Sequence, residues 1–147
     1  MSSDIDKIKF ISQKRIKVEG GDVLHVMKKS NSNNFKFGEA YFTFINNNSI
    51  KGWKMHTKMH CNLCVPIGEV KFICVSNDFK KFRTFLLSEK NYGRLSIPPG
   101  IWYSFKGIGK ENNLILNLSN IEHDDNEVKK INLDEFPLKL KIWKQLF

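Results

Sequence analysis

Long apolar segments are missing from this 147-residue sequence: no run approaches the ~20 residues that a membrane-spanning helix requires. The N-terminus, MSSDIDKIKF, lacks the apolar core of a secretory signal peptide. Cysteine is scarce as well, with three residues in the chain. This small, odd number suits a reduced protein better than a disulfide scaffold. These absences predict a cytoplasmic protein with no membrane partner.

Arginine is nearly absent, although the formal net charge is +9. Of the 24 basic residues only three are arginine, namely Arg15, Arg83 and Arg94, and the 21 lysines are spread along the chain. Nucleic-acid-binding proteins usually cluster their basic residues and use arginine. We therefore expect no nucleic-acid partner. The positive charge indicates either a solvated surface or attraction of a small anion such as a sugar nucleotide.

The residues that are abundant indicate one globular domain over 1–147. Hydrophobic residues make up 41% of the chain, and 12 residues are phenylalanine. A chain of this length and composition can bury a substantial core but is too short for two ordinary domains.

The hydrophobic pattern has a period of two, which is typical of half-buried strands. Strand-like runs are closed by Gly, Pro or Asn at short intervals, as in antiparallel sandwiches and barrels. The predicted strands are 40–45, two runs within 63–75, 81–86, 94–97, 101–105 and 113–119. A short helix is expected only within 127–147. The predicted fold class is therefore all-β, an antiparallel sandwich with a short helical or irregular C-terminal tail.

The run 113–119 has two different faces. Its leucines share one face, and Ile115, Asn117 and Ser119 share the other. The Asn and Ser side chains are therefore expected either to line a polar lumen or to face solvent.

The densest polar cluster spans 51–61. Lys54 and His56 are two residues apart, so on a strand they point to the same face and could combine an anion-holding cation with a titratable base. His56, His60, Cys61 and Cys64 lie close together in sequence and are residue types that bind zinc. No second ligand pair follows, and Cys61 and Cys64 point to opposite faces of a strand. We therefore expect no metal.

Six motifs occur in an order that resembles a known family. They are Gly38-Glu39-Ala40-Tyr41-Phe42, Lys51-Gly52-Trp53-Lys54-Met55-His56, Ile67-Gly68-Glu69-Val70-Lys71, Ile97-Pro98-Pro99-Gly100-Ile101-Trp102, Phe105-Lys106-Gly107-Ile108-Gly109 and Glu122-His123-Asp124-Asp125-Asn126-Glu127. Together they resemble the dTDP-4-dehydrorhamnose 3,5-epimerase group of cupins, over about 21–143. The resemblance implies a jelly-roll cupin without a metal or other cofactor, usually a homodimer, which binds a nucleotide-diphosphate sugar inside the barrel.

The resemblance also implies a chemistry, from which this sequence departs at two positions. The family abstracts a proton beside a C4 ketone and returns one to the opposite face. The family's base, a histidine, is replaced here by Lys54, and its acid, a tyrosine, is missing from 113–120. When the sequence is aligned with the two cupin metal motifs, the metal-ligand positions are occupied by Lys54, His56, Cys61 and Tyr103. This set resembles the metal-free branch of the cupins.

The predicted catalytic residues are His56, Lys54 and Tyr103. His56 is the preferred base and Lys54 the alternative one, which otherwise stabilises negative charge, and Tyr103 supplies either the acid or a hydrogen bond. Seven residues are expected to bind substrate: Lys51, Trp53, Asn62, Trp102, Lys106, Asn117 and Ser119. The expected function is epimerisation of a nucleotide-linked 4-keto sugar in surface-polysaccharide biosynthesis. Two alternatives stay open: a 3,4-ketoisomerase, and a catalytically silent cupin that binds a sugar nucleotide or scaffolds a partner enzyme.

Overall fold

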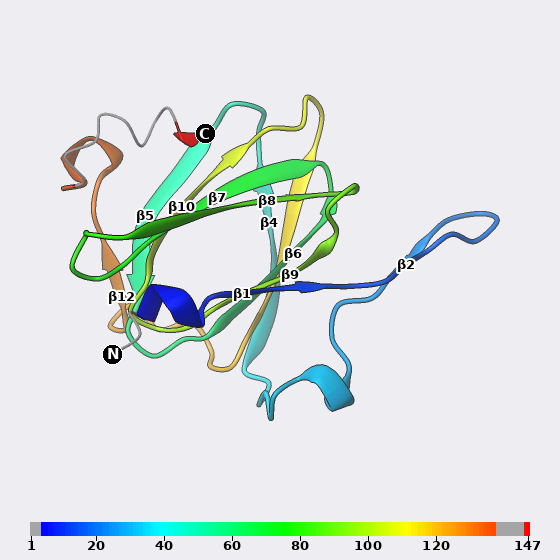
Figure 1. Ribbon diagram of the computed structural model, residues 1–147, viewed down its shortest axis with the longest axis horizontal. Coiled ribbons are helices and arrows are strands. Elements are labelled where there is room, and N and C mark those ends of the chain that lie inside the picture. The colour runs from blue at the N-terminus through cyan, green and yellow to red at the C-terminus, as the bar shows by residue number, and fades with distance from the viewer. Residues whose placement is uncertain (1–3, 138–145) are drawn as a thin grey trace.

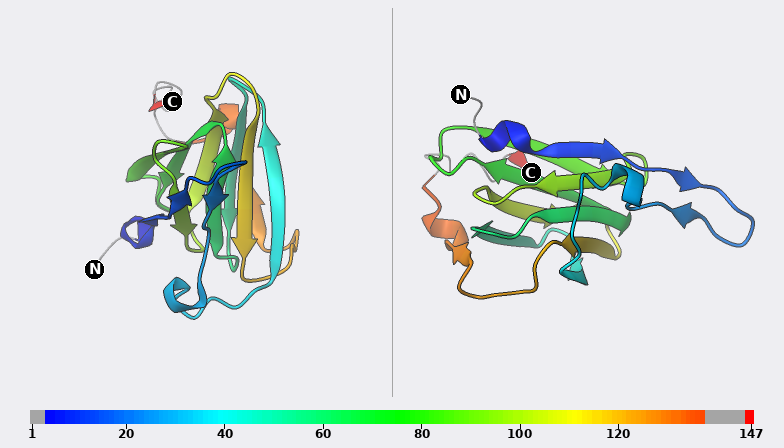
Figure 2. Two further views of the ribbon diagram at one scale, coloured as in Figure 1. Left: turned by 90° about the vertical axis from the view of Figure 1, so that its right-hand side faces the viewer. Right: turned by 90° about the horizontal axis from the view of Figure 1, so that it is seen from below.

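The computed structural model describes residues 4–137 and 146–147, and its body is a sandwich of two five-stranded antiparallel sheets (Figures 1 and 2). The first sheet has the order β1 (Lys9–Ser12), β9 (Gly93–Ile97), β6 (Cys61–Ile67), β11 (Asn113–Ser119) and β4 (Glu39–Ile45). The second sheet has the order β12 (Val128–Lys130), β5 (Ile50–His56), β10 (Trp102–Gly107), β7 (Glu69–Val75) and β8 (Phe82–Ser88). This confirms the predicted all-β sandwich.

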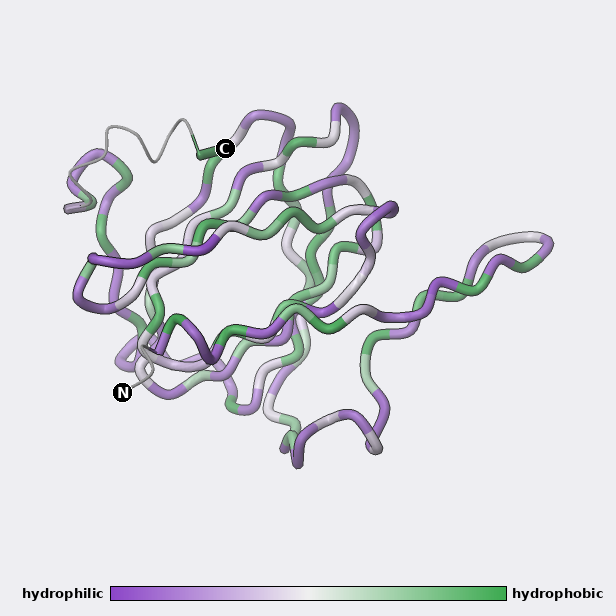
Figure 3. Tube along the Cα trace, viewed as in Figure 1, coloured by the Kyte–Doolittle hydropathy of each residue, from purple (hydrophilic) through white to green (hydrophobic). Residues whose placement is uncertain are grey.

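The main core lies between the sheets, where alternate residues of each strand point inward. Leu63, Phe72, Leu95, Phe105 and Ile115 belong to this buried cluster. The residues beside them in sequence therefore face outward. Figure 3 shows the resulting mixture of hydrophobic and hydrophilic positions along the strands.

A second apolar cluster covers the outer face of the second sheet. Trp53 of β5 and Trp102 of β10 pack there against Phe136, which follows the 3-10 turn η3 (Leu133–Glu135). The Trp53 and Phe136 rings stack with their centroids 3.8 Å apart. The segment after β12 thus shields one side of β5, while the other side of that strand faces the interior.

Two short N-terminal strands form a hairpin that projects from the sandwich. Strands β2 (Arg15–Ile16) and β3 (Val23–Leu24) pair with each other and with no strand of either large sheet (Figure 1). The remaining short elements are the 3-10 turns η1 (Asp4–Lys7) and η2 (Lys29–Asn31). Within the described residues, no helix is both long and apolar enough to cross a membrane.

The C-terminal tail within 127–147 is expected to be helical or irregular, and up to residue 137 it is irregular apart from one short strand and one 3-10 turn. Val128–Lys130 extends the second sheet by pairing with the edge of β5, and Leu133–Glu135 makes a single 3-10 turn. The backbone N–H and C=O groups of β12 thus find partners on the edge of the second sheet. Residues 138–145 lie outside the described part of the chain.

Candidate functional site

His56 and Glu127 form the chemical centre of the interior. His56 ends β5 and points inward, and its Nδ1 is hydrogen-bonded to the Glu127 carboxylate in the loop before β12. A carboxylate only accepts hydrogen bonds, so Nδ1 carries the proton and Nε2 is left as a basic nitrogen. The other carboxylate oxygen accepts the backbone N–H groups of Lys58 and Met59 at 3.0 and 3.1 Å. Both the position and the tautomer of the imidazole are therefore fixed.

Burial governs the titration of this pair. It lowers the pKa of His56, and the hydrogen bond and charge of Glu127 offset only part of the effect. Burial alone would raise the pKa of Glu127, but the hydrogen bonds from His56, Lys58 and Met59 bring that pKa below its ordinary value. At neutral pH the pair therefore consists of a neutral imidazole and a carboxylate, which is the state that a general base requires.

Lys54 and Tyr103 lie beside His56 on the second sheet. The Tyr103 hydroxyl is 3.4 Å from His56 Nε2 and 4.0 Å from the Cys61 sulfur, and Lys54 Nζ lies 5.3 Å from the centre of the Tyr103 ring. Burial lowers the pKa of Lys54 and raises that of Tyr103 well above 10, so Tyr103 keeps its proton. The structure thus brings the three predicted catalytic side chains together.

The first sheet contributes a second tyrosine across the interior. Tyr41 on β4 lies opposite Asn117 on β11, and the Asn117 amide donates a 2.9 Å hydrogen bond to the Tyr41 hydroxyl. Asn117 Oδ1 in turn accepts the Asn62 backbone N–H at 3.0 Å, which holds the amide in place. Burial raises the pKa of Tyr41, so this hydroxyl is also protonated at neutral pH.

Four of these side chains, Lys54, Tyr103, Tyr41 and Asn117, line a small cavity between the sheets, and His56 lies behind Tyr103 outside its lining. The volume of the cavity is about 20 Å³, and its walls include Lys54 and Tyr103 from the second sheet and Tyr41, Thr43 and Asn117 from the first. Lys54, Tyr41 and Thr43 are only half-buried, so the cavity is closest to solvent along β4 and β5. A space of this size holds about one water molecule, and a sugar ring enters only if lining side chains move.

Trp53 and Trp102, both predicted to bind substrate, are not in this cavity. They alternate with Lys54 and Tyr103 along their strands, so they point outward and are buried under Phe136. The alternation of side chains along a strand is the physical reason: Lys54 and Trp53 cannot both face the lumen on a regular strand. The prediction for the two tryptophans is therefore corrected to a role in packing.

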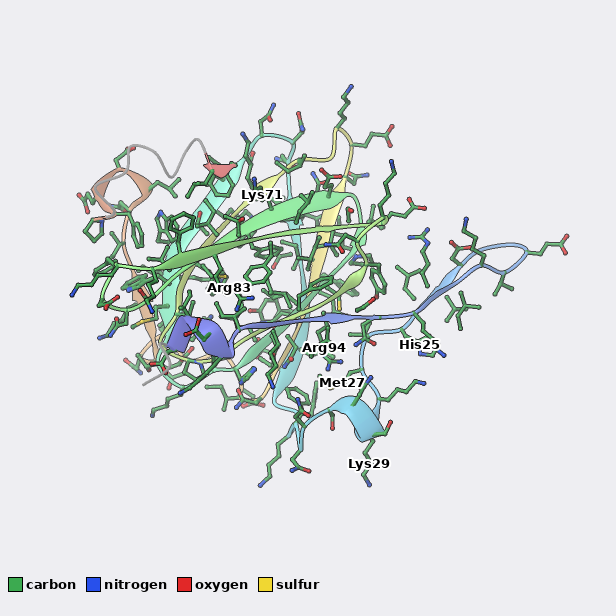
Figure 4. All side chains as sticks on the ribbon, in the orientation of Figure 1. His25, Met27, Lys29, Lys71, Arg83 and Arg94 are labelled. Carbon is green, nitrogen blue, oxygen red and sulfur yellow. The ribbon has the colours of Figure 1, made fainter. Side chains whose placement is uncertain are left out.

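The other predicted binding residues are also dispersed. Lys51 Nζ donates to the Phe44 carbonyl at 2.7 Å, which links the second sheet to β4 near the rim. Lys106 shares the outward side of β10 with Trp102 and lies opposite Lys71, which is labelled in Figure 4. Neither lysine lines the cavity, and their expected contact with the substrate's charged groups stays a prediction.

Asn62 and Ser119 lie near Asn117, but their side chains make structural hydrogen bonds outside the cavity. Asn62 points to the outer face of the first sheet, where its amide donates to the Leu118 carbonyl at 3.2 Å. The Ser119 hydroxyl is fully buried and lies 2.9 and 3.1 Å from the carbonyls of Ile121 and Glu39. Of the predicted substrate-binding residues, only Asn117 lines the cavity.

The expected absence of a metal stays a prediction. Across residues 4–137 and 146–147, no group of three or more His, Cys, Asp or Glu side chains is arranged to hold a metal ion. Cys61 faces the lumen and Cys64 faces the other side of β6, next to Arg94. Burial raises the pKa of Cys61 to about 11, which disfavours the thiolate that metal binding needs.

Two functional residues were missed from the sequence. Glu127 and Tyr41 both lie in motifs that carry the family resemblance, but neither motif indicates that its residue reaches the interior. Glu127 is 71 residues from its partner His56, and Tyr41 is 76 residues from Asn117. Only the pairing of β12 with β5 and of β4 with β11 brings them together.

The geometry defines a class of protein: a cupin-type sandwich with a carboxylate-held histidine, a lysine and two tyrosines in its lumen. No protein-family model matches the sequence, and a search of curated proteins finds no match. Solved structures do match, over nearly the whole chain. Among them are dTDP-sugar epimerases and isomerases, and the chain shares their cupin fold.

Three of these structures show the extent of the similarity. A dTDP sugar isomerase from Desulfovibrio desulfuricans is 27% identical, with 91% of this chain and 89% of that chain covered and a TM-score of 0.84. The dTDP-4-dehydrorhamnose 3,5-epimerase from Bacillus anthracis, solved with TDP and PPi, is 13% identical, with coverages of 95% and 87% and a TM-score of 0.79. A histidine-to-asparagine variant of a 3,4-ketoisomerase from Thermoanaerobacterium thermosaccharolyticum, in complex with TDP-4-keto-6-deoxyglucose, is 20% identical, with coverages of 86% and 88% and a TM-score of 0.72.

Proposed function

We propose that this protein abstracts a proton from the carbon beside the ketone of a nucleotide-linked 4-keto sugar and returns a proton to the resulting enolate. One observation carries the proposal: a buried histidine whose Nδ1 donates to Glu127 and whose unprotonated Nε2 faces the Tyr103 hydroxyl at 3.4 Å, with Lys54 beside the Tyr103 ring. The similarity to dTDP-sugar epimerases and isomerases supports the substrate class.

His56 is the base of this reaction. The C–H bond breaks, the proton moves to Nε2, and the electron pair forms the C=C bond of the enolate. Glu127 stabilises the imidazolium that forms, because its carboxylate already accepts the Nδ1–H. No large pKa shift is needed, since imidazole titrates near neutrality.

Lys54 is the cation that stabilises the enolate oxygen. Its half-buried ammonium lines the cavity beside Tyr103, whose hydroxyl contacts His56, so it is only partly screened by water. As a base at neutral pH, Lys54 would need a pKa several units below the ordinary ~10.4. His56 needs no such shift in its pKa. His56 is therefore assigned the role of base, and Lys54 that of charge stabiliser.

Epimerisation needs an acid on the opposite face of the sugar, and Tyr41 is the candidate. Tyr103 lies on the same sheet as His56, and its hydroxyl is 3.4 Å from His56 Nε2. Its role is therefore to orient the imidazole or to relay a proton on the side of the sugar that the base attacks. Tyr41 comes from the facing sheet and is held by Asn117. Tyr41 thus fills the role of the tyrosine that is missing from 113–120.

A 3,4-ketoisomerase is the second candidate, and the 27% identical dTDP sugar isomerase favours it. In that reaction His56 removes the C3 proton, an enediol forms, and a proton is delivered to C4 while the hydroxyl at C3 becomes the ketone. The neighbouring Tyr103 hydroxyl is suitably placed to move the hydroxyl proton.

We also propose that the protein works as a cytoplasmic homodimer in surface-polysaccharide biosynthesis. Two aromatic side chains on the outer face of β4, Phe42 and Phe44, are 62% and 64% exposed. Leu114, Leu116 and Leu118 of the adjacent β11 share this face. A contiguous apolar face of this kind suits contact with a second copy of the chain.

The experiment is incubation with TDP-4-keto-6-deoxyglucose in deuterated water, followed by NMR. Deuterium at C3 or C5 with inversion identifies an epimerase, and migration of the ketone to C3 identifies the isomerase. Binding without any exchange across a panel of 4-keto sugar nucleotides contradicts the enzyme proposal and leaves the sugar-nucleotide-binding or scaffold role.

A further inference from the structure

A second cavity lies on the outer face of the first sheet, on the other side of that sheet from the His56 site. Its volume is about 280 Å³, and segment 32–36 forms part of its wall. The polar side chains that line it include His60, Asn62, Arg94, Ser96 and Asn120, with Lys36 from the covering segment. Leu63, Leu95 and Ile97 alternate with these residues and point into the core, so the sheet separates the two cavities.

Arg94 is the unusual residue of this cavity. Its side chain is 1% exposed, and its two terminal nitrogens donate to the carbonyls of Val26 and Asn31 at 2.6 and 3.0 Å. Figure 4 shows Arg94 where the chain from His25 to Lys29 passes the sheet. Its Nε is buried without a hydrogen-bond partner, and no carboxylate among the described residues forms an ion pair with it.

A buried guanidinium with no anionic partner is energetically unusual. Withdrawing a cation from water costs several kcal/mol, and neutral carbonyl acceptors return only part of that cost. Arginine cannot relieve the cost by losing its proton, because it stays charged in proteins. An anion bound close to Arg94 would offset the cost of burying its positive charge.

The rest of the cavity is suited to such an anion. No Asp or Glu is among the residues that line it, all of which belong to the described part of the chain. His60 Nε2 lies 2.6 Å from the Ser96 hydroxyl, and the His60 backbone N–H donates to Asn120 Oδ1 at 2.7 Å. The hydroxyl, the imidazole, the amides and the Lys36 ammonium therefore surround the space with hydrogen-bond donors and positive charge.

We propose that this outer cavity binds a small phosphate-class anion, with Arg94 supplying buried charge, Ser96 and His60 supplying hydrogen bonds and Lys36 closing the rim. The volume is at the lower limit of the ~300–1,000 Å³ typical of pockets for drug-sized molecules. The space therefore suits phosphate or pyrophosphate rather than a complete nucleotide sugar. Because the sheet separates it from His56, binding here does not depend on the proposed catalysis.

The test titrates the full-length protein with sodium phosphate and with sodium pyrophosphate at constant ionic strength, with sodium chloride as the reference. Imidazole NMR follows His60, and the exposed His123 is the internal control. We expect saturable shifts of the His60 signals and a higher His60 pKa in the bound state, because an anion favours the imidazolium. Equal responses to chloride, or no saturable response to either probe, would overturn the proposal.

Two variants test the location without disturbing the tethered guanidinium. Lys36→Ala and Ser96→Ala should each weaken binding roughly three- to ten-fold, as expected for loss of one charge-assisted or hydroxyl contact. Lys29→Ala is the matched lysine control, because Lys29 is exposed on η2 and does not line the cavity. Unchanged affinity in both test variants places the anion elsewhere and contradicts the site. His56→Asn should bind the anion like the parent, so failure of the proposed enzyme function is recognised separately.

Discussion

Glu127 determines which nitrogen of His56 is available for chemistry. The carboxylate accepts the Nδ1–H and is itself held by two backbone N–H groups, so the imidazole cannot easily turn or change tautomer. At the residue scale, the basic strength of His56 therefore depends on a side chain that the local sequence around His56 does not contain.

Replacing Glu127 with glutamine tests this dependence. Glu127 raises the His56 pKa, so Glu127→Gln should lower that pKa further and make the base weaker. We expect turnover to fall about 10- to 100-fold, and the acid limb of the pH–rate profile to move to lower pH.

Glu122→Gln is the control, because Glu122 is exposed and lies in the same loop. It should leave both turnover and the pH profile unchanged. An unchanged profile in Glu127→Gln would mean that the carboxylate does not tune the base.

Tyr41→Phe separates proton removal from inversion. His56 can still remove a proton and return a deuteron to the same face, so we expect solvent exchange to continue while the epimerised product is lost. NMR of the recovered sugar measures both outcomes at once. Inversion at the parent rate would exclude Tyr41 as the acid and return that role to Tyr103.

Strand β5 has two functions, one on each face. Lys54 and His56 face the lumen, while Trp53 and Met55 pack under the C-terminal segment. The two-residue spacing indicated that Lys54 and His56 would share a face if they lay on a strand, which β5 provides, but the spacing could not say which face is the lumen. Both faces are covered, so the outward tryptophan is as buried as an inward one.

The same reasoning explains which elements could be predicted. Long strands such as β4, β6, β7 and β11 carry enough alternating residues to be recognised from the sequence. Strands β2, β3 and β12 have only two or three residues, too few to establish a period, and they exist because a neighbouring edge offers partners. Glu127 was missed with β12, since its position depends on that pairing.

Trp53→Ala tests the packing role at the scale of this element. Trp53 is 1% exposed and stacked on Phe136, so the variant should lose roughly 3–5 kcal/mol of unfolding free energy in urea denaturation. Lys51→Ala, two residues away and exposed, should lose less than about 1 kcal/mol. A fully stable Trp53→Ala protein would contradict the packing role.

At the scale of the whole molecule, the two sheets present different outer surfaces. Around β5 and β10 the second sheet is covered by the chain's own residues near Phe136, whereas β4 of the first sheet exposes Phe42 and Phe44 beside the half-buried leucines of β11. The projecting β2–β3 hairpin adds further exposed apolar residues, Ile16, Val18 and Val23 (Figure 1). These surfaces are the physical basis of the proposed homodimer.

The double variant Phe42→Ser and Phe44→Ser tests that assembly. We expect size-exclusion chromatography with light scattering to show a dimer for the parent and a monomer, or at least a ten-fold weaker dimer, for the variant. Phe82→Ser is the control, because Phe82 is also exposed but lies on the second sheet. A monomeric parent, or an unaffected variant, would contradict the proposed interface.

The most direct test of the account is solvent-deuterium exchange into a 4-keto sugar nucleotide by His56→Asn and Lys54→Met, measured by NMR beside the parent protein. The account predicts that His56→Asn binds the nucleotide sugar but incorporates no deuterium, because the base is lost. Lys54→Met should bind more weakly and exchange more slowly, yet still exchange, because Nε2 of His56 remains. Full exchange by His56→Asn together with none by Lys54→Met would reverse the two roles and contradict the central claim.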